Sequence, residues 1–142
     1  MKILIICTGN TCRSQMAEGF LRSFNTDLEV FSAGTVAEGL VNPFAIKAMA
    51  EVSVDISNQK PESVSLYLNE AFDYVITVCD GAKEVCPVFA GEVKHHRHMG
   101  FDDPASAKGT EEEVMPVYRR IRDEIRDSFY KFFKQINHSD DE

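Results

Sequence analysis

Short apolar runs rich in β-branched residues alternate along the chain with longer segments whose apolar residues recur at helical spacing. The expected strands are Lys2–Ile6, Leu28–Ser32, Tyr74–Val78 and the shorter Val93–His95. The expected helices are Ser14–Phe24, Pro43–Glu51, a piece near Glu62–Leu68 and the C-terminal segment. This alternation predicts a single-domain α/β fold with a four-stranded, mainly parallel sheet and helices on both faces.

The C-terminal segment carries the clearest helical pattern. One apolar stripe recurs at steps of four and three: Val114, Tyr118, Ile121, Ile125, Phe129, Phe132 and Ile136. The glutamates Glu111–Glu113 lie where a helix N-terminus favours negative charge, and Pro116 is expected in the first turn, where proline is tolerated. The stripe therefore predicts core packing in one domain spanning residues 1–137, followed by an acidic, frayed tail at 138–142.

Charge and hydropathy argue against two classes of protein. The formal net charge is −8, which disfavours general nucleic-acid binding because phosphate contacts need basic faces. No apolar run is long enough to cross a bilayer, so no membrane association is expected. The opening MKILIIC is apolar only briefly before the polar TGNTCRS, which favours a buried strand of a cytoplasmic protein over a signal peptide.

The first expected strand leads directly into the loop CTGNTCRS, residues 7–14, and then into a helix. Ligands of parallel sheets bind beyond the carboxyl ends of the strands, where Cys7 falls. Gly9 lets the backbone approach a ligand closely and take a positive φ if required. Loop N–H groups and the helix N-terminus form an anion cradle, and Arg13 adds a fork of donors for a tetrahedral oxyanion. The expected oxyanion-binding residues are Thr8, Gly9, Asn10, Thr11, Cys12, Arg13 and Ser14.

The same loop can activate Cys7 as a nucleophile. Its positive field favours the thiolate, which is the reactive form of cysteine, and the Ser14 hydroxyl can hold that thiolate by a hydrogen bond. Nucleophile and oxyanion clamp then surround one point. A buried cysteine that ends a strand before an ordinary helix is the structural alternative. The position of the motif between an expected strand and an expected helix favours the catalytic interpretation.

The four cysteines are Cys7, Cys12, Cys79 and Cys86, with spacings C-x4-C and C-x6-C. Neither spacing matches the C-x2-C pairs typical of structural zinc, so a zinc site is disfavoured. In a reducing compartment, cysteines are more often catalytic or inert than part of a static disulfide framework. The basic cluster Lys94–His98 is expected to be exposed on an edge strand or loop rather than to bind metal.

Taken together, these motifs resemble the low-molecular-weight protein tyrosine phosphatase superfamily, and within it the thioredoxin-coupled arsenate reductases. The resemblance spans nearly the whole chain. It is carried by CTGNTCRSQMAEG, SAG at Ser32–Gly34, the VNP, AI and AM motifs within Val41–Met49, DIS at Asp55–Ser57 and GFDDPA at Gly100–Ala105. It implies a low-molecular-weight phosphatase-like fold and arsenate as the substrate, with phosphate or sulfate as look-alike anions.

The resemblance also implies a redox relay. Cys7, Cys79 and Cys86 would pass two electrons to arsenate, and thioredoxin would reduce the resulting disulfide. Cys12 is not required for turnover in this family. If residues 80–86 were helical, the Cα atoms of the last two relay cysteines would lie about 10 Å apart. A disulfide spans at most about 7 Å between Cα atoms, so forming it is expected to unwind the segment.

The segment GFDDPAS provides the expected general acid. Asp103 stands directly before Pro104, which fixes the direction of the loop, and it matches the family's acid. Asp102 is expected to be a solvated or loop-capping carboxylate. In the phosphatase branch aromatic residues that grip phosphotyrosine follow the acid, whereas Ala105 and Ser106 follow it here. This difference favours the reductase branch.

Two other functions stay open. A low-molecular-weight protein tyrosine phosphatase would need only the first cysteine, and a non-enzymatic redox or oxyanion sensor would bind without turnover. No cofactor is required by any of the three. Some reductases of the family bind a potassium ion beside the loop, and the matching positions are Asn10, Glu18, Ser32 and Glu62. The family pattern has aspartate at the last of these, so the longer side chain there departs from it.

Overall fold

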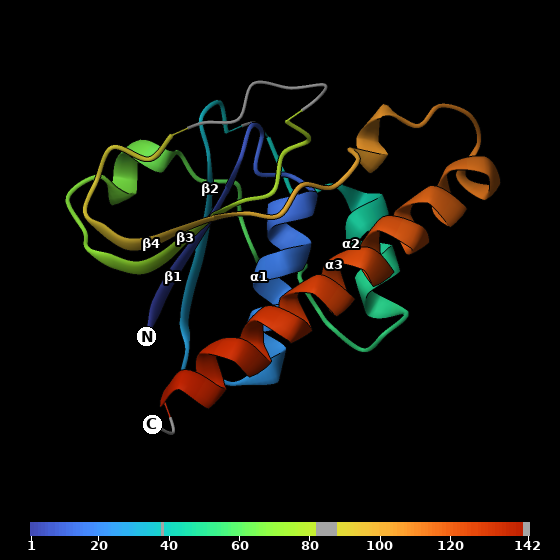
Figure 1. Ribbon diagram of the computed structural model, residues 1–142. Helices are drawn as coiled ribbons and strands as arrows, with labels where there is room; N and C mark the ends of the chain where they lie inside the picture. The colour runs from blue at the N-terminus through green and yellow to red at the C-terminus, as the bar shows by residue number, and fades with distance from the viewer. Residues whose placement is uncertain (38, 82–87, 141–142) are drawn as a thin grey trace.

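The computed structural model describes residues 1–37, 39–81 and 88–140 and contains one four-stranded sheet (Figure 1). Its strands are β1 (Lys2–Cys7), β2 (Glu29–Gly34), β3 (Phe72–Thr77) and β4 (Val93–His98). They lie in the order β2–β1–β3–β4, and every neighbouring pair is parallel. The α-helices are α1 (Arg13–Phe24), α2 (Pro43–Ala50) and α3 (Glu111–Asp140). The predicted α/β fold with a four-stranded parallel sheet is confirmed.

The strand order makes β1 the point at which the winding of the sheet reverses. The chain passes from β1 through α1 to β2 on one side and later crosses back over β1 to reach β3 on the other. The connections that leave β1 and its neighbour therefore diverge, which opens the crevice where ligands bind in such sheets. Cys7 is the last residue of β1. The topology thus brings Cys7 to this crevice.

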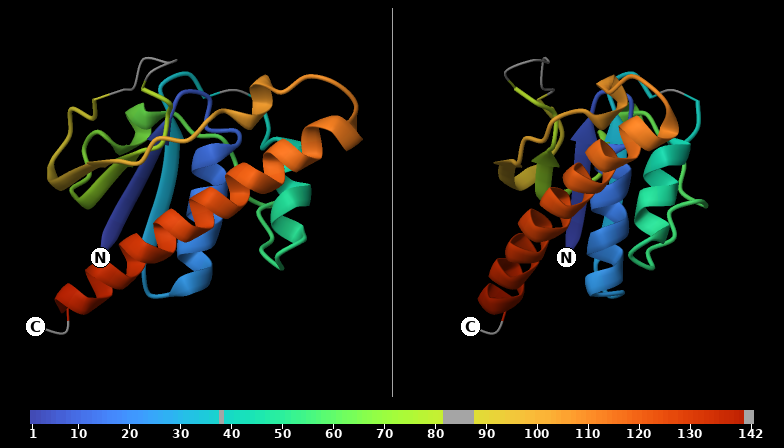
Figure 2. Two further views of the ribbon diagram at one scale, coloured as in Figure 1. Left: turned by 45° about the vertical axis from the view of Figure 1, so that its right-hand side comes forward. Right: turned by 90° about the vertical axis from the view of Figure 1, so that its right-hand side faces the viewer.

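The two faces of the sheet are covered differently. Ile3 and Ile5 belong to a large core formed with α1, α2 and α3, whereas Leu4 and Ile6 pack on the opposite face in a smaller cluster. Figure 2 shows α3 crossing α1, with α2 beside them. Within the described segments, the second face is covered by the 3-10 helix η1 (Val64–Tyr67) and by the residues around position 89. The helix expected near 62–68 is therefore only this short 3-10 turn.

Helix α3 carries the predicted apolar stripe, and all seven of its residues are buried. Pro116 lies beyond the first turn, which differs from the expectation. The helix tolerates it because Pro116 is exposed, so water can reach the Glu112 carbonyl that lacks its N–H donor. The helix continues to Asp140, past the expected start of the tail at residue 138. No helix in the described segments is long and apolar enough to cross a membrane.

Candidate active site

The loop between β1 and α1 lines a pocket of about 310 Å³ at the carboxyl edge of the sheet. All the predicted oxyanion-binding residues line it except Ser14, which is fully buried. The wall opposite the loop comes from Asp103 and Ala105, which follow β4 in the chain. The pocket is therefore shared by two segments about ninety residues apart, as the motifs CTGNTCRS and GFDDPA predict.

The predicted contact between Cys7 and Ser14 is present. Cys7 Sγ lies 3.1 Å from Ser14 Oγ. Asn10 Nδ2 donates to that same hydroxyl oxygen at 2.7 Å. Because Ser14 accepts from Asn10, the single hydroxyl proton of Ser14 is left to donate to the sulfur. This direction suits a thiolate, which accepts hydrogen bonds but cannot donate them.

The sharp turn of the loop is made by Asn10 rather than by Gly9. Asn10 has a φ of 56°, and asparagine is one of the few non-glycine residues that take this left-handed conformation readily. Its backbone oxygen accepts from Gln15 Nε2 at 2.9 Å, and its side-chain oxygen accepts from the Glu62 N–H at 2.9 Å. Gly9, which could take a positive φ if required, does not do so, and these hydrogen bonds hold Asn10 in that conformation instead.

Gly34 is a loop-positioning residue that sequence reasoning missed. A Cβ at this position would lie only 2.3 Å from the backbone oxygen of Thr8 and 3.1 Å from Asn10 N. Only glycine lets the end of β2 approach the oxyanion loop this closely. The motif SAG contained the signal, since a glycine at the end of a strand often marks close backbone approach.

Arg13 joins the oxyanion loop to the segment that carries the expected acid. Its guanidinium is buried, and Nη1 donates to the backbone oxygen of Phe101 at 3.1 Å. Its Nη2 lies 3.8 Å from Asp103 Oδ2. Asp103 also caps the 3-10 helix η2 (Pro104–Ser106), because its Oδ1 accepts from the Ala105 N–H at 3.0 Å. The structure thus brings the predicted nucleophile, oxyanion clamp and acid to one pocket.

Asp102 points elsewhere, as expected for a carboxylate outside the reaction. Its Oδ2 lies 3.3 Å from Arg120 Nη2 on α3, and both side chains are half exposed. Asp102 does not line the pocket of Cys7. The two adjacent aspartates therefore have different environments, and only Asp103 faces the oxyanion loop.

Cys79 emerges at the same edge of the sheet as Cys7. Strands β1 and β3 pair through Ile6 and Thr77, and the Val78 N–H donates to the Ile6 oxygen at 3.1 Å. Cys79 follows directly and is fully buried. It is disulfide-bonded, whereas the first two cysteines of the chain are free thiols. Cys86 lies outside the described residues, and so does the expected unwinding of residues 80–86.

Cys12 lies inside the loop but is poorly suited to nucleophilic attack. Burial, together with the negative charge of Asp103, raises the pKa of the Cys12 thiol far above its usual value, although Arg13 opposes this. A thiol kept protonated at neutral pH reacts slowly. The environment agrees with the expectation from the resemblance that Cys12 is not needed for turnover.

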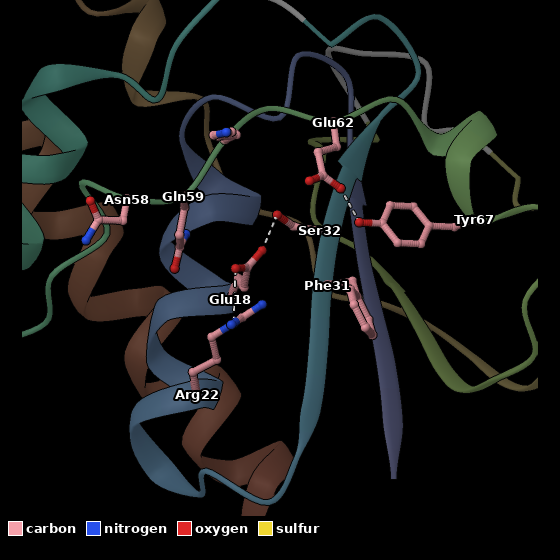
Figure 3. A pocket seen from close by; sticks show the side chains of 9 residues that line it. Glu18, Arg22, Phe31, Ser32, Asn58, Gln59, Glu62 and Tyr67 are labelled. Atoms are coloured by element: carbon pink, nitrogen blue, oxygen red, sulfur yellow. Dashed lines mark hydrogen bonds and ion pairs between the residues drawn. The ribbon is translucent and has the colours of Figure 1, made fainter.

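Three of the four residues considered for potassium surround a second cavity, of about 400 Å³ (Figure 3). Glu18 enters it from α1 and accepts from the Ser32 hydroxyl at 2.7 Å. Glu62 enters it from the opposite side and accepts from the hydroxyl of Tyr67. The fourth residue, Asn10, reaches this group through its Nδ2, which donates to Ser32 Oγ at 2.9 Å. Sequence reasoning missed Arg22, whose Nε lies 3.1 Å from Glu18 Oε2.

The cluster Lys94–His98 makes up all of the edge strand β4 except its first residue, and all five of its side chains are exposed. His98 Nδ1 lies 2.8 Å from Thr77 Oγ1, and the His95 ring stacks on Tyr74. Among the residues that the structure describes, no group of three or more histidine, cysteine or acidic side chains could hold a metal ion.

Comparison with known proteins agrees with this geometry. The sequence model of the family described as "Low molecular weight phosphotyrosine protein phosphatase" matches residues 2–141. A relative from Shouchella clausii (strain KSM-K16), named arsenate reductase, is 50% identical over 131 residues, which are 92% of this chain and 93% of the relative.

Solved structures give the same picture. An arsenate reductase in the phosphate binding state aligns with a TM-score of 0.78 and 27% identity over 95% of this chain and 98% of its own. A thioredoxin-dependent arsenate reductase from Corynebacterium glutamicum aligns with a TM-score of 0.67 and 26% identity over 97% of this chain and 62% of its own. Since the family match covers nearly every residue, the chain belongs to the low-molecular-weight phosphotyrosine protein phosphatase family.

Proposed function

We propose that this protein is an arsenate reductase that uses Cys7, Cys79 and Cys86 as a thiol relay and is returned to its reduced form by thioredoxin. The relatives named arsenate reductase support the reaction. The observation that carries the proposal is the position of Cys79, which follows the strand next to the one that ends at Cys7. A hydrolase of this fold would need only the first of these cysteines.

Arsenate binds in the pocket of the oxyanion loop. The Arg13 guanidinium and the backbone N–H groups of residues 8–13 hold its oxygens, while the N-terminus of α1 adds a favourable field. Phosphate and sulfate have the same tetrahedral shape and a similar charge, so both are expected to compete for this pocket. A phosphate-bound state of a related arsenate reductase supports this expectation.

In the first step the Cys7 thiolate attacks arsenic. An S–As bond forms and an As–O bond breaks, and Asp103 gives its proton to the departing oxygen, which leaves as water. Ser14 holds the thiolate before attack by its hydrogen bond to the sulfur. The Asp103 side chain is 39% exposed at the mouth of the pocket, so water can leave and the proton can be replaced from solvent.

In the second step two electrons pass to arsenic. The Cys79 thiolate attacks the Cys7 sulfur, an S–S bond forms, and the S–As bond breaks with its electron pair on arsenic, which leaves as arsenite. Cys86 then attacks Cys79, so that Cys7 becomes a thiolate again and the disulfide moves to Cys79–Cys86. The two thiols of thioredoxin reduce that disulfide. This requires a reducing compartment, and we place the protein in the cytoplasm.

The strand pairing supports the transfer from Cys7 to Cys79. Strands β1 and β3 stay paired as far as Ile6 and Thr77, and the Val78 N–H donates to the Ile6 oxygen, so Cys7 and Cys79 leave neighbouring strands at the same edge of the sheet. Neighbouring strands lie about 4.8 Å apart, which is within the roughly 7 Å that a disulfide spans between Cα atoms. In the structure Cys79 is disulfide-bonded and Cys7 is free, as expected after arsenite release and before reduction by thioredoxin.

Arsenite release distinguishes the proposal from phosphatase activity. Wild type, Cys79→Ser and Cys86→Ser are each incubated with arsenate, thioredoxin, thioredoxin reductase and NADPH. Sustained arsenite release by wild type alone supports the relay, and equal turnover by all three contradicts it. Hydrolysis of an aryl phosphate is measured in parallel. Strong hydrolysis that is indifferent to Cys79→Ser, without arsenite release, would favour the phosphatase.

A further inference from the structure

Arg22 occupies a defined position at the cavity shown in Figure 3. Its Nε lies 3.1 Å from Glu18 Oε2, one helical turn earlier on α1, and its Nη2 donates to the backbone oxygen of Val30 at 2.6 Å. These two contacts tie the guanidinium to both α1 and β2. Although its side chain is 54% exposed, Arg22 is therefore held beside Glu18 rather than left to extend into solvent.

The Glu18 carboxylate needs a counter-charge at this position. Its side chain is only 9% exposed, and burial raises its pKa because a charged carboxylate loses hydration. The charge of Glu62 across the cavity raises that pKa further, whereas the hydrogen bond from Ser32 and the charge of Arg22 lower it. Removal of the Arg22 charge would therefore raise the pKa of Glu18 further.

One of the four residues at the potassium positions of the family, Asn10, does not present its side-chain oxygen to the other three in this chain. Hard cations are held by oxygen ligands. Asn10 directs its NH2 group toward Ser32, and its oxygen is turned to the Glu62 N–H at 2.9 Å and to Gln15 Nε2 at 3.1 Å. The Ser32 hydroxyl lies between Asn10 and Glu18. Asn10 therefore does not complete a potassium site with Glu18, Ser32 and Glu62, and Arg22 already supplies a positive charge.

We propose that Arg22 is a built-in counter-ion that replaces potassium, keeps Glu18 ionised, and thereby strengthens a hydrogen-bond chain that ends at Cys7. The chain runs from Glu18 through the Ser32 hydroxyl, the Asn10 amide and the Ser14 hydroxyl to the sulfur. All four links have donor–acceptor distances between 2.7 and 3.1 Å. Arg22 is thus a positioning residue, because it acts on Cys7 only through the other side chains.

The direction of the chain follows from the charge of Glu18 together with the Glu62 N–H, which holds the Asn10 oxygen. An ionised carboxylate only accepts, so Ser32 must donate to Glu18 and accept from Asn10. The second N–H of the amide then points at Ser14, whose proton is left for Cys7. A protonated Glu18 could donate to Ser32 instead, which would make the Ser32 hydroxyl a weaker acceptor for the Asn10 N–H. The Glu62 N–H and Gln15 Nε2 still hold the Asn10 oxygen, so the amide keeps its orientation and the change reaches Cys7 as weaker hydrogen bonds along the chain.

Arg22→Gln and Arg22→Lys test the proposal without arsenate. The first readout is the rate at which iodoacetamide alkylates Cys7 at neutral pH, quantified by mass spectrometry of the Cys7 peptide. The second is the melting temperature in KCl and in NaCl at equal ionic strength. Arg126→Gln is the matched control, because Arg126 is also a half-exposed arginine in ion pairs but lies on α3.

Wild type is expected to show the same melting temperature and the same alkylation rate in KCl and NaCl. Arg22→Gln should slow alkylation about fivefold, which is less than the loss of a whole hydrogen bond to a charged group would cause, and KCl should restore the rate better than NaCl. Arg22→Lys and Arg126→Gln should behave as wild type. Glu18→Gln, which can donate to Ser32, should slow alkylation even though Arg22 is present.

Two results would overturn the proposal. One is a wild-type melting temperature that is higher in KCl than in NaCl, and the other is an Arg22→Gln variant whose Cys7 is alkylated as fast as that of wild type. The inference rests on the proposed function only in expecting that kcat/KM for arsenate falls in parallel with the alkylation rate. A wild type that releases no arsenite but gives the expected alkylation pattern would remove the arsenate reductase assignment and leave the role of Arg22 in place.

Discussion

Arg13 donates from Nη1 to the backbone oxygen of Phe101, 3.1 Å away in space and 88 residues away in the chain. Phe101 stands two residues before Asp103, so the oxyanion clamp and the segment that carries the proposed acid are physically connected. An anion that draws the guanidinium toward itself therefore acts on both segments. One arginine can thus clamp an oxyanion and position the proposed acid.

Arg13→Lys is expected to lower kcat/KM for arsenate by about 100-fold, since an ammonium cannot reproduce the planar fork. Most of the loss should appear as a higher KM, because the fork holds oxygens that are present before and after attack. Steady-state arsenite release measures both constants, and the melting temperature checks that the fold is intact. A change of less than about threefold would show that the backbone N–H groups bind the anion without the guanidinium.

Asp103→Asn is expected to lower kcat by about 100-fold, because the departing oxygen loses its proton donor. Asp102→Asn is the matched control. Its exposed ion pair with Arg120 contributes about 1 kcal/mol or less, so kcat should stay close to that of wild type. Rapid-quench measurement of the first turnover follows the chemical step directly. Equal losses of kcat in both variants would mean that the conformation of the loop, rather than the carboxyl group of Asp103, determines the rate.

Gly34→Ala is expected to destabilise the protein by about 2 kcal/mol, because the new Cβ would collide with a backbone atom, Thr8 O. Gly9→Ala should cost clearly less, since the closest atom to its new Cβ is Thr11 Oγ1 at 3.7 Å, an ordinary contact. Urea unfolding of both variants gives the two free energies. Similar losses would indicate that β2 can retreat from the oxyanion loop without cost.

Glu51→Gln is expected to change the pH dependence of stability. Hydrogen bonds from Arg119 and Arg122 lower the pKa of Glu51 in the folded protein below its ordinary value of 4.5. The carboxylate therefore stabilises the fold above pH 4.5, and this contribution disappears as the pH falls through the lower folded-state pKa. The difference in urea midpoint between wild type and variant should be largest at pH 7 and vanish in acid. A difference that persists unchanged in acid would contradict this.

The elements set by local periodicity could be predicted from the sequence. The stripe of α3 and the apolar run of β1 each bury one continuous set of side chains, so spacing alone identifies them. The oxyanion loop could be predicted as well, because cysteine, glycine and arginine between a strand and a helix have a chemical meaning together. The shared pocket of Cys7, Arg13 and Asp103 agrees with that prediction.

The features that could not be predicted depend on contacts between distant segments. The positive φ of Asn10 is held by Gln15 and by the Glu62 N–H, 52 residues away, whereas the loop sequence alone suggested only that Gly9 permits such a conformation. The pairing of Glu18 with Arg22 has the spacing of any ion pair on a helix surface. Its placement at a cavity is visible only once β2 and the segment containing Glu62 have packed beside α1.

The relay itself is tested most directly by a single turnover. Fully reduced protein is mixed with arsenate in the absence of thioredoxin, its free thiols are blocked in acid, and its disulfides are mapped by mass spectrometry. The account predicts that one arsenite is released per chain and that the protein loses two hydrogens by forming a disulfide between Cys79 and Cys86. Cys7 should be recovered with the blocking group attached, as expected of a free thiol. Arsenite released without that bond, or a bond between Cys7 and Cys12 in its place, would contradict it.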